Sequence, residues 1–134
     1  MEHSDLIDIA SKARVLAYAP YSKFAVGAAI IMKSGKIFVR CNIENVSLGL
    51  TICAQRCAVA AAIVQGSRDL VAVAIVTDST KPAAPGGACR QVLAEFNPNM
   101  KVFAATLGGE VQQFELAELL PLPGQGVLEG MRRV

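Results

Sequence analysis

Two cysteines of this sequence stand at positions where a thiolate would be chemically useful. Cys53 lies in the first turn of one predicted helix, and Cys89 lies at the start of another. Unpaired backbone N–H groups and the helix dipole favour negative charge at such positions, and an arginine follows closely in both cases. A thiolate there can ligate a metal or act as a nucleophile. Cys41 and Cys57 are more simply interpreted as small buried side chains.

The segment around Cys53 is predicted to be the helix around which the fold is organised. Thr51 is its expected N-cap, Gly66 stands where a helix usually ends, and residues 57–64 are apolar on every face. A helix without a polar face is buried all round, so we expect a sheet on one side and a partner subunit on the other. In an open α/β sheet, sites lie beyond the carboxyl ends of the strands, where Cys53 and Cys89 are both expected.

Hydrophobic periodicity and turn residues predict the element order α-β-β-α-β-α-β-β-α. The first helix is expected over residues 4–19, with Ser4 as its cap and Pro20 as its stop. The remaining elements are strands at 24–32 and 37–43 forming a hairpin, the central helix, a strand at 70–77 buried on both faces, a helix at 88–96, strands at 101–107 and 111–114, and a helical turn at 115–120. Residues 1–134 are therefore expected to form a single α/β domain, an α-β-α sandwich with a mixed five-stranded sheet.

The bulk properties narrow the class of protein. A net charge of +2 over 134 residues gives no support for nucleic-acid binding. No apolar run approaches the ~20 residues of a transmembrane helix, and the first five residues do not form a signal peptide. We therefore expect a cytoplasmic protein whose four cysteines are reduced. A composition of 53% hydrophobic and 18% charged residues favours an oligomer over a monomer.

Several segments, taken in order and spacing, resemble one family over nearly the whole chain: the small, homotetrameric, zinc-dependent cytidine deaminases. The resemblance implies the cytidine deaminase-like fold, a homotetramer and a pocket for a small-molecule nucleoside. The matching segments are Ala19-Pro-Tyr-Ser-Lys-Phe24 with Val26-Gly-Ala-Ala29, Cys41-Asn-Ile-Glu-Asn45, Cys53-Ala-Gln-Arg56, Pro85-Gly-Gly-Ala-Cys-Arg-Gln-Val-Leu93 and, more weakly, Glu118-Leu-Leu-Pro121.

The resemblance implies a substrate-binding role for four residues. Phe24 would line the face of the pyrimidine, and the backbone of Ala54 would contact the base. Asn42 and Glu44 would hold ribose hydroxyls. Together with Asn45, these two polar residues close the second strand without an evident structural duty of their own.

The resemblance also implies a zinc site, with Cys53 and Cys89 as ligands and Arg56 balancing the thiolate charge. Two departures fall on this site. Gly86 stands where the family has its middle cysteine ligand, and Gln55 stands where it has its catalytic glutamate. A catalytic zinc needs three protein ligands, and a glutamine has no proton to transfer as general acid or base. Zinc is therefore expected to be bound weakly or not at all.

Two further positions bear on this expectation. Cys57 lies one helical turn beyond Cys53 on the same face and is a conceivable third thiolate, although it sits deeper in the helix than the family's metal. After Pro121 the family has an aromatic residue that reaches into a neighbouring subunit's site, and this sequence has none there.

Three hypotheses of different classes follow. In the first, the protein keeps the nucleoside-type pocket but has lost zinc-dependent deamination. In the second, it is an active cytidine or deoxycytidine deaminase, converting cytidine to uridine with an atypical metal site. In the third, it is a metal-free enzyme with Cys89 or Cys53 as nucleophile. The lack of a histidine base argues against this hypothesis, because the single histidine, His3, lies near the terminus. Assembly with an intact paralogue is a fourth, purely structural role.

Overall fold

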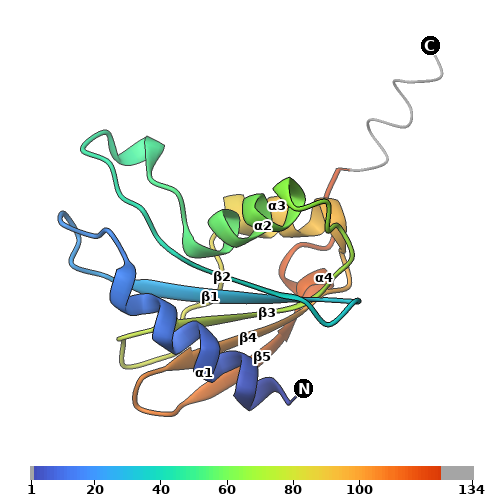
Figure 1. The fold of residues 1–134 in the computed structure, drawn as a ribbon, viewed down its shortest axis with the longest axis horizontal. Coiled ribbons are helices and arrows are strands. Elements are labelled where there is room, and N and C mark those ends of the chain that lie inside the picture. The colour runs from blue at the N-terminus through green and yellow to red at the C-terminus, as the bar shows by residue number, and fades with distance from the viewer. Residues whose placement is uncertain (1, 125–134) are drawn as a thin grey trace.

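The computed structural model describes residues 2–124 of the chain. Its elements follow the predicted order (Figure 1). They are α1 (His3–Ala13), η1 (Arg14–Leu16), β1 (Val26–Met32), β2 (Ile37–Cys41), η2 (Leu48–Leu50), α2 (Ala54–Val64), β3 (Leu70–Thr77), α3 (Gly87–Phe96), β4 (Lys101–Thr106), β5 (Val111–Glu115) and α4 (Leu116–Leu119).

The strands form one mixed sheet in the order β2-β1-β3-β4-β5. All neighbouring pairs are antiparallel except β3 and β4, which run parallel and are connected through α3. Helix α1 covers one face of the sheet, while α2 and α3 lie side by side on the other (Figure 1). The expected α-β-α sandwich with a five-stranded sheet is confirmed.

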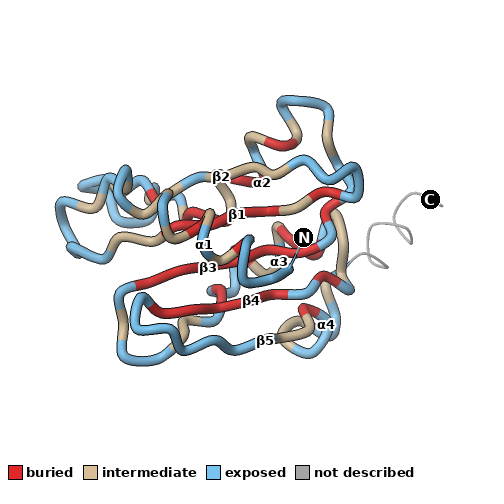
Figure 2. The backbone as a smooth tube through the Cα atoms, turned by 60° about the horizontal axis from the view of Figure 1, so that its bottom comes forward, coloured by how far each residue is buried: buried red, intermediate tan, exposed pale blue. Residues whose placement is uncertain are grey.

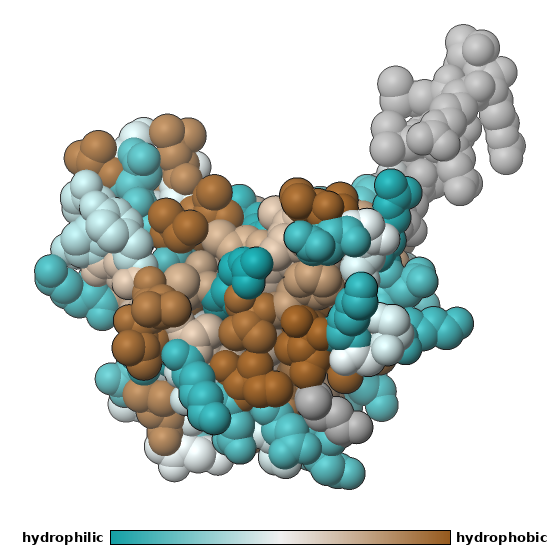
Figure 3. All heavy atoms as spheres, in the orientation of Figure 1, coloured by the Kyte–Doolittle hydropathy of each residue, from teal (hydrophilic) through white to brown (hydrophobic). Residues whose placement is uncertain are grey.

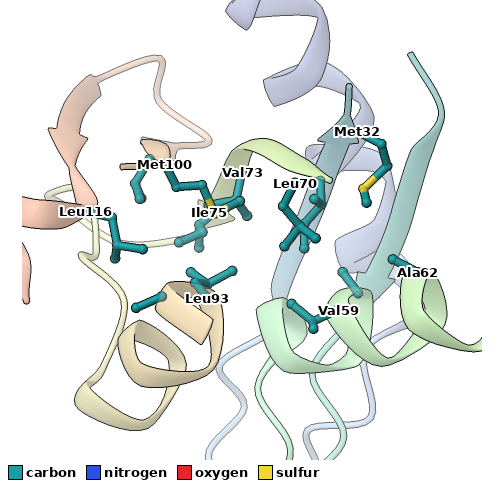
Figure 4. Close-up of a cluster of buried hydrophobic side chains, with 13 residues drawn as sticks. Met32, Val59, Ala62, Leu70, Val73, Ile75, Leu93, Met100 and Leu116 are labelled. Atoms are coloured by element: carbon teal, nitrogen blue, oxygen red, sulfur yellow. The ribbon is translucent and has the colours of Figure 1, made fainter. Parts of the chain in front are cut away.

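The central strand β3 is buried on both faces, as its apolar sequence predicts (Figure 2). Its larger side chains, Leu70, Val73 and Ile75, point toward α2 and α3 and join the main hydrophobic core (Figure 4). The alternate residues 72, 74 and 76 point toward α1, and two of them are alanines. Small side chains on that face allow α1 to lie close against the sheet.

Gly27 marks the closest approach between α1 and β1. A Cβ added there would lie 1.9 Å from the carbonyl oxygen of Ala10 and 3.0 Å from the backbone nitrogen of Arg14. Backbone atoms of a helix cannot yield locally, so any side chain at this position must displace α1 as a whole.

The first helix is shorter than predicted. It begins after Glu2 rather than Ser4 and ends at Ala13, where the chain tightens into the η1 turn. The Arg14 side chain donates a hydrogen bond from Nε to the carbonyl of Ala25 at 2.9 Å, which ties this turn to the start of β1. The apolar pattern that suggests a helix up to residue 19 therefore spans a helix, a turn and an extended segment.

The central helix also begins later than predicted. Cys53, not Thr51, is its N-cap residue, and no side chain caps it. The Thr51 hydroxyl instead accepts a hydrogen bond from the backbone N–H of Asn45. The predicted end is confirmed: Gly66 has a positive φ of 79°, and the N–H groups of Gly66 and Ser67 bond back to the carbonyls of Ile63 and Ala62.

Among residues 2–124, no helix is long and apolar enough to cross a membrane. The four cysteines are all free.

Replacing Gly27 with alanine is expected to destabilise the fold by about 2 kcal/mol or more, because the new methyl group overlaps the backbone of α1. Thermal or denaturant unfolding measures the change. Gly49→Ala is the matched control, since an added Cβ there meets open space, and its effect should stay within about 0.5 kcal/mol. Equal effects of the two substitutions would contradict the packing described for Gly27.

Candidate active site

A cavity of about 210 Å³ lies at the end of the sheet where β1 begins and β3 ends. The loops that precede β1 and α2 project from this same end of the molecule, at the left of Figure 1. The cavity is smaller than the ~300–1,000 Å³ of common ligand pockets. Its walls are made by Phe24, Val26, Asn42, Thr51, Cys53, Ala54, Gln55, Ile75, Thr77, Ala83 and Ala84.

The cavity brings together five of the residues singled out from the sequence: Phe24, Asn42, Cys53, Ala54 and Gln55. Glu44, Arg56 and Cys89 do not line it.

The sequence analysis missed the contribution of β3 and the loop after it. Thr77 pairs with Val26 across the strands, and it lies on the same side of β3 as Ile75. The period-two alternation of β3 could have identified both of these residues, whereas nothing in the sequence marks Ala83 and Ala84 as cavity walls.

Asn42 has a clear structural duty, contrary to the sequence-based interpretation. Its side chain is buried, accepting the N–H of Val26 at Oδ1 and donating from Nδ2 to the carbonyl of Phe24, both at 2.9 Å. The amide takes the place of backbone ladder bonds beyond β2. This is why Phe24 lies outside the strand in which it was predicted and faces the cavity instead.

Glu44 likewise has a structural duty that the sequence did not reveal. Its Oε1 accepts the N–H groups of Tyr21 and Ser22 at 3.0 and 3.1 Å, and its Oε2 accepts the Ser22 hydroxyl. These hydrogen bonds, those of Ser22 first, lower the pKa of the Glu44 carboxyl, with help from the charge of Lys23. The ionised carboxylate thus holds the loop that carries Phe24. Asn45 also has a local duty, accepting the N–H of Ser47 at 2.9 Å.

Cys53 and Cys89 lie close together at the starts of α2 and α3, as predicted. A hydrogen bond from Cys89 lowers the pKa of Cys53, and the Arg56 guanidinium adds to this through a 3.5 Å contact with the Cys53 sulfur. The same hydrogen bond and burial raise the pKa of Cys89. The lowered pKa of Cys53 favours its thiolate form, and the Arg56 guanidinium is placed to balance that charge.

Arg90, the arginine next to Cys89 in the sequence, has a structural role. Arg90 donates from Nε to the carbonyl of Pro85 at 2.7 Å and from Nη1 to the carbonyl of Leu119 at 3.1 Å. It clamps the loop before α3 to the end of α4, and these hydrogen bonds within residues 2–124 go to backbone carbonyls rather than to the Cys89 thiol. Its proximity to Cys89 in the sequence is therefore structural.

The sequence and the fold both have counterparts among known proteins. Residues 1–106 match the family model described as "Cytidine and deoxycytidylate deaminase zinc-binding region". The chain belongs to the cytidine deaminase family. It is 49% identical over 122 residues to a cytidine deaminase of Halalkalibacterium halodurans, covering 90% of this chain and 92% of that protein.

Other members support the same assignment. A cytidine deaminase of Sporosarcina psychrophila is 46% identical over 122 residues, covering 90% of each chain. The crystal structure of cytidine deaminase from Burkholderia pseudomallei superposes with a TM-score of 0.88 at 44% identity, covering 90% of this chain and 98% of that one. A Glu-to-Gln mutant of the Mycobacterium tuberculosis enzyme has a TM-score of 0.78 at 37% identity, with 90% and 96% covered.

The residues of this chain do not fit the family's zinc. Among residues 2–124, no group of three or more His, Cys, Asp or Glu side chains is placed to hold a metal ion. Gly86, the N-cap of α3, supplies no donor atom, and the two thiols of Cys53 and Cys89 leave the set one ligand short of a catalytic zinc site.

Cys57 does not fill the gap. It lies with Ile43, Ile52 and Val64 along a groove on the outer side of α2, not along the cavity. Burial, followed by the nearby Cys41 and Cys53 charges, raises the pKa of its thiol, which disfavours the thiolate that a metal requires.

Gln55 lies on the cavity wall. It is 5% exposed, and its Oε1 is buried and accepts no hydrogen bond within the described part of the chain. An amide at this position has neither a proton to release nor a charge to attract one.

Restoring the missing donor is expected to create a metal site. Gly86 has an ordinary extended backbone, with φ −68° and ψ 168°, and a Cβ added to it meets nothing within 4 Å, so Gly86→Cys should be tolerated without strain. The variant is expected to bind one Zn²⁺ or Co²⁺ per chain, the latter visible by thiolate-to-cobalt absorption. Gly87→Cys is the control, because its Cβ also meets open space one residue further along. Equal metal binding by both variants would contradict a specific role of position 86 in completing the metal site.

Proposed function

We propose that this protein binds a pyrimidine nucleoside, or a close analogue, in the cavity and does not carry out zinc-dependent deamination. The observation that carries the proposal is the contrast between a retained cavity and an incomplete donor set. The walls contributed by Phe24, Asn42 and Ala54 are in place, while the metal site is left with Cys53 and Cys89.

The binding half of the proposal rests on the cavity walls. The ring of Phe24, 39% exposed, would lie against one face of the base, and the backbone of Ala54 would contact its edge. Asn42 and Glu44, whose polar atoms already hold the Phe24 loop, would act on the ligand chiefly by fixing that wall. Their proposed contacts with the ribose would use the remaining lone pairs of the same oxygens.

The chemical half rests on Gln55. Hydrolytic deamination needs a group that moves a proton from water to the departing amine, a task typically worth 10²–10⁴-fold in rate. Gln55 has the length of a glutamate but cannot take up or release that proton. Loss of the proton carrier and loss of a metal ligand therefore act on the same reaction.

One observation favours the alternative, an active cytidine or deoxycytidine deaminase. The chain is 49% identical to a protein named cytidine deaminase over nearly the full length of both. Such an enzyme would need an atypical metal site built on two thiolates. Deamination of cytidine by the unmodified protein distinguishes the two hypotheses.

A metal-free thiol enzyme is less well supported. The lowered pKa of Cys53 favours a nucleophile. However, His3 stacks on Phe103 with ring centroids 5.0 Å apart, and Phe103 belongs to the core on the α1 side of the sheet, away from the cavity. No imidazole is therefore available as its base.

The decisive experiment compares deamination with binding. With zinc supplied, the protein is expected to leave the absorbance of cytidine and deoxycytidine unchanged while calorimetry detects their binding. The double variant Gly86→Cys/Gln55→Glu is expected to deaminate cytidine at least about 10²-fold faster than the unmodified protein. Gly86→Cys alone serves as the matched control, gaining metal without the proton carrier. Zinc-dependent turnover by the unmodified protein would favour the active-enzyme reading.

We also propose that the protein is a homotetramer. The outer side of α2 and the adjoining loop expose many apolar side chains, some of them visible at the upper left of Figure 3. They include Ile43, Val46, Leu48, Leu50, Ile52 and Val64. Solvent-exposed apolar surface of this extent favours burial against another chain, and a partner there would complete the enclosure of α2.

Light scattering coupled to gel filtration tests the assembly. The expected mass is four times the 14.1 kDa of one chain. Val64→Glu, at a side chain 81% exposed in the single chain, should reduce that mass by placing a charge in the interface. Val111→Glu on the far edge strand β5 is the control and should leave it unchanged. A monomer, or a mixed assembly with a second protein, would contradict the homotetramer.

A further inference from the structure

The aromatic wall of the cavity is held on both sides of the Phe24 backbone. The carbonyl of Phe24 accepts a hydrogen bond from Nδ2 of Asn42 at 2.9 Å. The N–H of Phe24 donates to the hydroxyl oxygen of Ser22 at 3.0 Å. Asn42 lines the cavity, whereas Ser22 does not and is exposed to solvent. Ser22 therefore contacts the backbone of the wall without being part of the cavity.

The Ser22 hydroxyl is itself fixed by the Glu44 carboxylate. It donates its hydrogen to Oε2 of Glu44, while Oε1 accepts the backbone N–H groups of Tyr21 and Ser22. A serine hydroxyl has one hydrogen and two lone pairs. Because the hydrogen is directed to the carboxylate, the lone pairs remain for the N–H of Phe24. The hydrogen bonds thus form a continuous chain from Phe24 through Ser22 to a charged acceptor, which strengthens it.

The backbone between Ser22 and Phe24 is strained. Lys23 has a φ of 61°, and among residues 2–124 it is the one non-glycine residue with a positive φ. This conformation is unfavourable for a residue with a Cβ and persists only where neighbouring contacts enforce it. The contacts here are the hydrogen bond from the Lys23 N–H to the Ala19 carbonyl at 3.1 Å and the two made by the Ser22 hydroxyl. The direction in which Phe24 leaves the loop therefore depends on Ser22.

We propose that Ser22 is a positioning residue for ligand binding. Its hydroxyl connects the Glu44 carboxylate to the backbone of Phe24 and so orients the aromatic ring against the base, although Ser22 does not touch the ligand. This inference rests on the proposed nucleoside binding and adds which residue outside the cavity sets the affinity.

The chain offers a matched control in Ser34. Its hydroxyl oxygen accepts the N–H of Lys36 two residues further on at 3.3 Å, just as that of Ser22 accepts the N–H of Phe24. Ser34 is also exposed, and it lies in the turn between β1 and β2, at the end of β1 opposite to the cavity. Ser34→Ala therefore removes a hydrogen bond of the same kind away from the proposed site.

Calorimetry on the purified full-length protein, in buffer with a chelator, measures the affinity for cytidine and uridine. Ser22→Ala is expected to bind both about fivefold more weakly than the unmodified protein, as the loss of one net hydrogen bond provides. Ser22→Thr keeps the hydroxyl, and both it and Ser34→Ala should stay within about twofold of the unmodified protein. Ser22→Val has the shape of threonine without the hydroxyl and repeats the comparison should Ser22→Ala alter the melting curve.

The titration of Glu44 reports on the same hydroxyl without a ligand. The side-chain hydrogen bond from Ser22 is the largest cause of the lowered pKa of the Glu44 carboxyl, and Lys23 supplies the nearby charge. Removing a donor to the ionised form raises a carboxyl pKa. Carboxyl-carbon NMR is therefore expected to show a higher Glu44 pKa in Ser22→Ala than in the unmodified protein. Ser22→Thr and Ser34→Ala should leave that pKa lowered.

The outcomes separate this inference from the proposed function. Failure of the unmodified protein to bind either nucleoside overturns the proposed function and with it this inference. Equal affinities of Ser22→Ala and the unmodified protein overturn this inference alone. The same holds for a folded Ser22→Thr that binds as weakly as Ser22→Ala, for an equal loss of affinity in Ser34→Ala, and for a Glu44 pKa that Ser22→Ala leaves unchanged.

Discussion

The burial of α2 against the sheet is the interaction on which the rest of this structure depends. Ala58, Val59 and Ala62 join the main hydrophobic core, and the small alanines let the helix lie close to the strands. Figure 4 shows Val59 and Ala62 of α2 within this cluster. Because the helix axis is fixed along its length, its first turn is fixed as well. Cys53, Ala54 and Gln55 are thereby held at the end of the sheet, next to the loop that follows β3.

This packing explains how the site can lose residues without loss of the fold. The cores on both sides of the sheet are apolar and contain neither Gln55 nor Gly86. Gly86 has free space around it, and the Arg56 guanidinium lies against the Cys53 sulfur as a counter-charge. The scaffold therefore constrains the positions of the reacting groups but not their identities. Fold and chemistry can diverge independently in such a chain.

The sequence was sufficient for the architecture. Strand β3 was predicted to the residue, and the helix with Cys89 to within one residue, because long apolar runs and Gly-Pro loops mark both. The errors have a common cause. The ends of α1, β1 and α2 depend on contacts made by Arg14, Asn42 and Thr51 with residues several to many positions away. Local propensity carries no information about such contacts.

The residues of the cavity could be predicted only in part. Cys53 was singled out by its type at a helix start, and Phe24 and Gln55 through the resemblance to the family. The structure places all three around one cavity. Residues that serve by shape, such as Ala83 and Ala84, have no chemical signature. The supporting tasks of Glu44 and Asn45 required knowledge of the loops that they hold.

The central claim is that the family's metal centre is incomplete in a member that keeps its fold. The most direct measurement is the zinc content of the unmodified protein, produced with zinc in the medium and purified without chelators, by elemental analysis against protein concentration. The account predicts well under one zinc per chain. One tightly held zinc per chain would contradict it, since two thiols at helix starts would then suffice where three ligands are the rule.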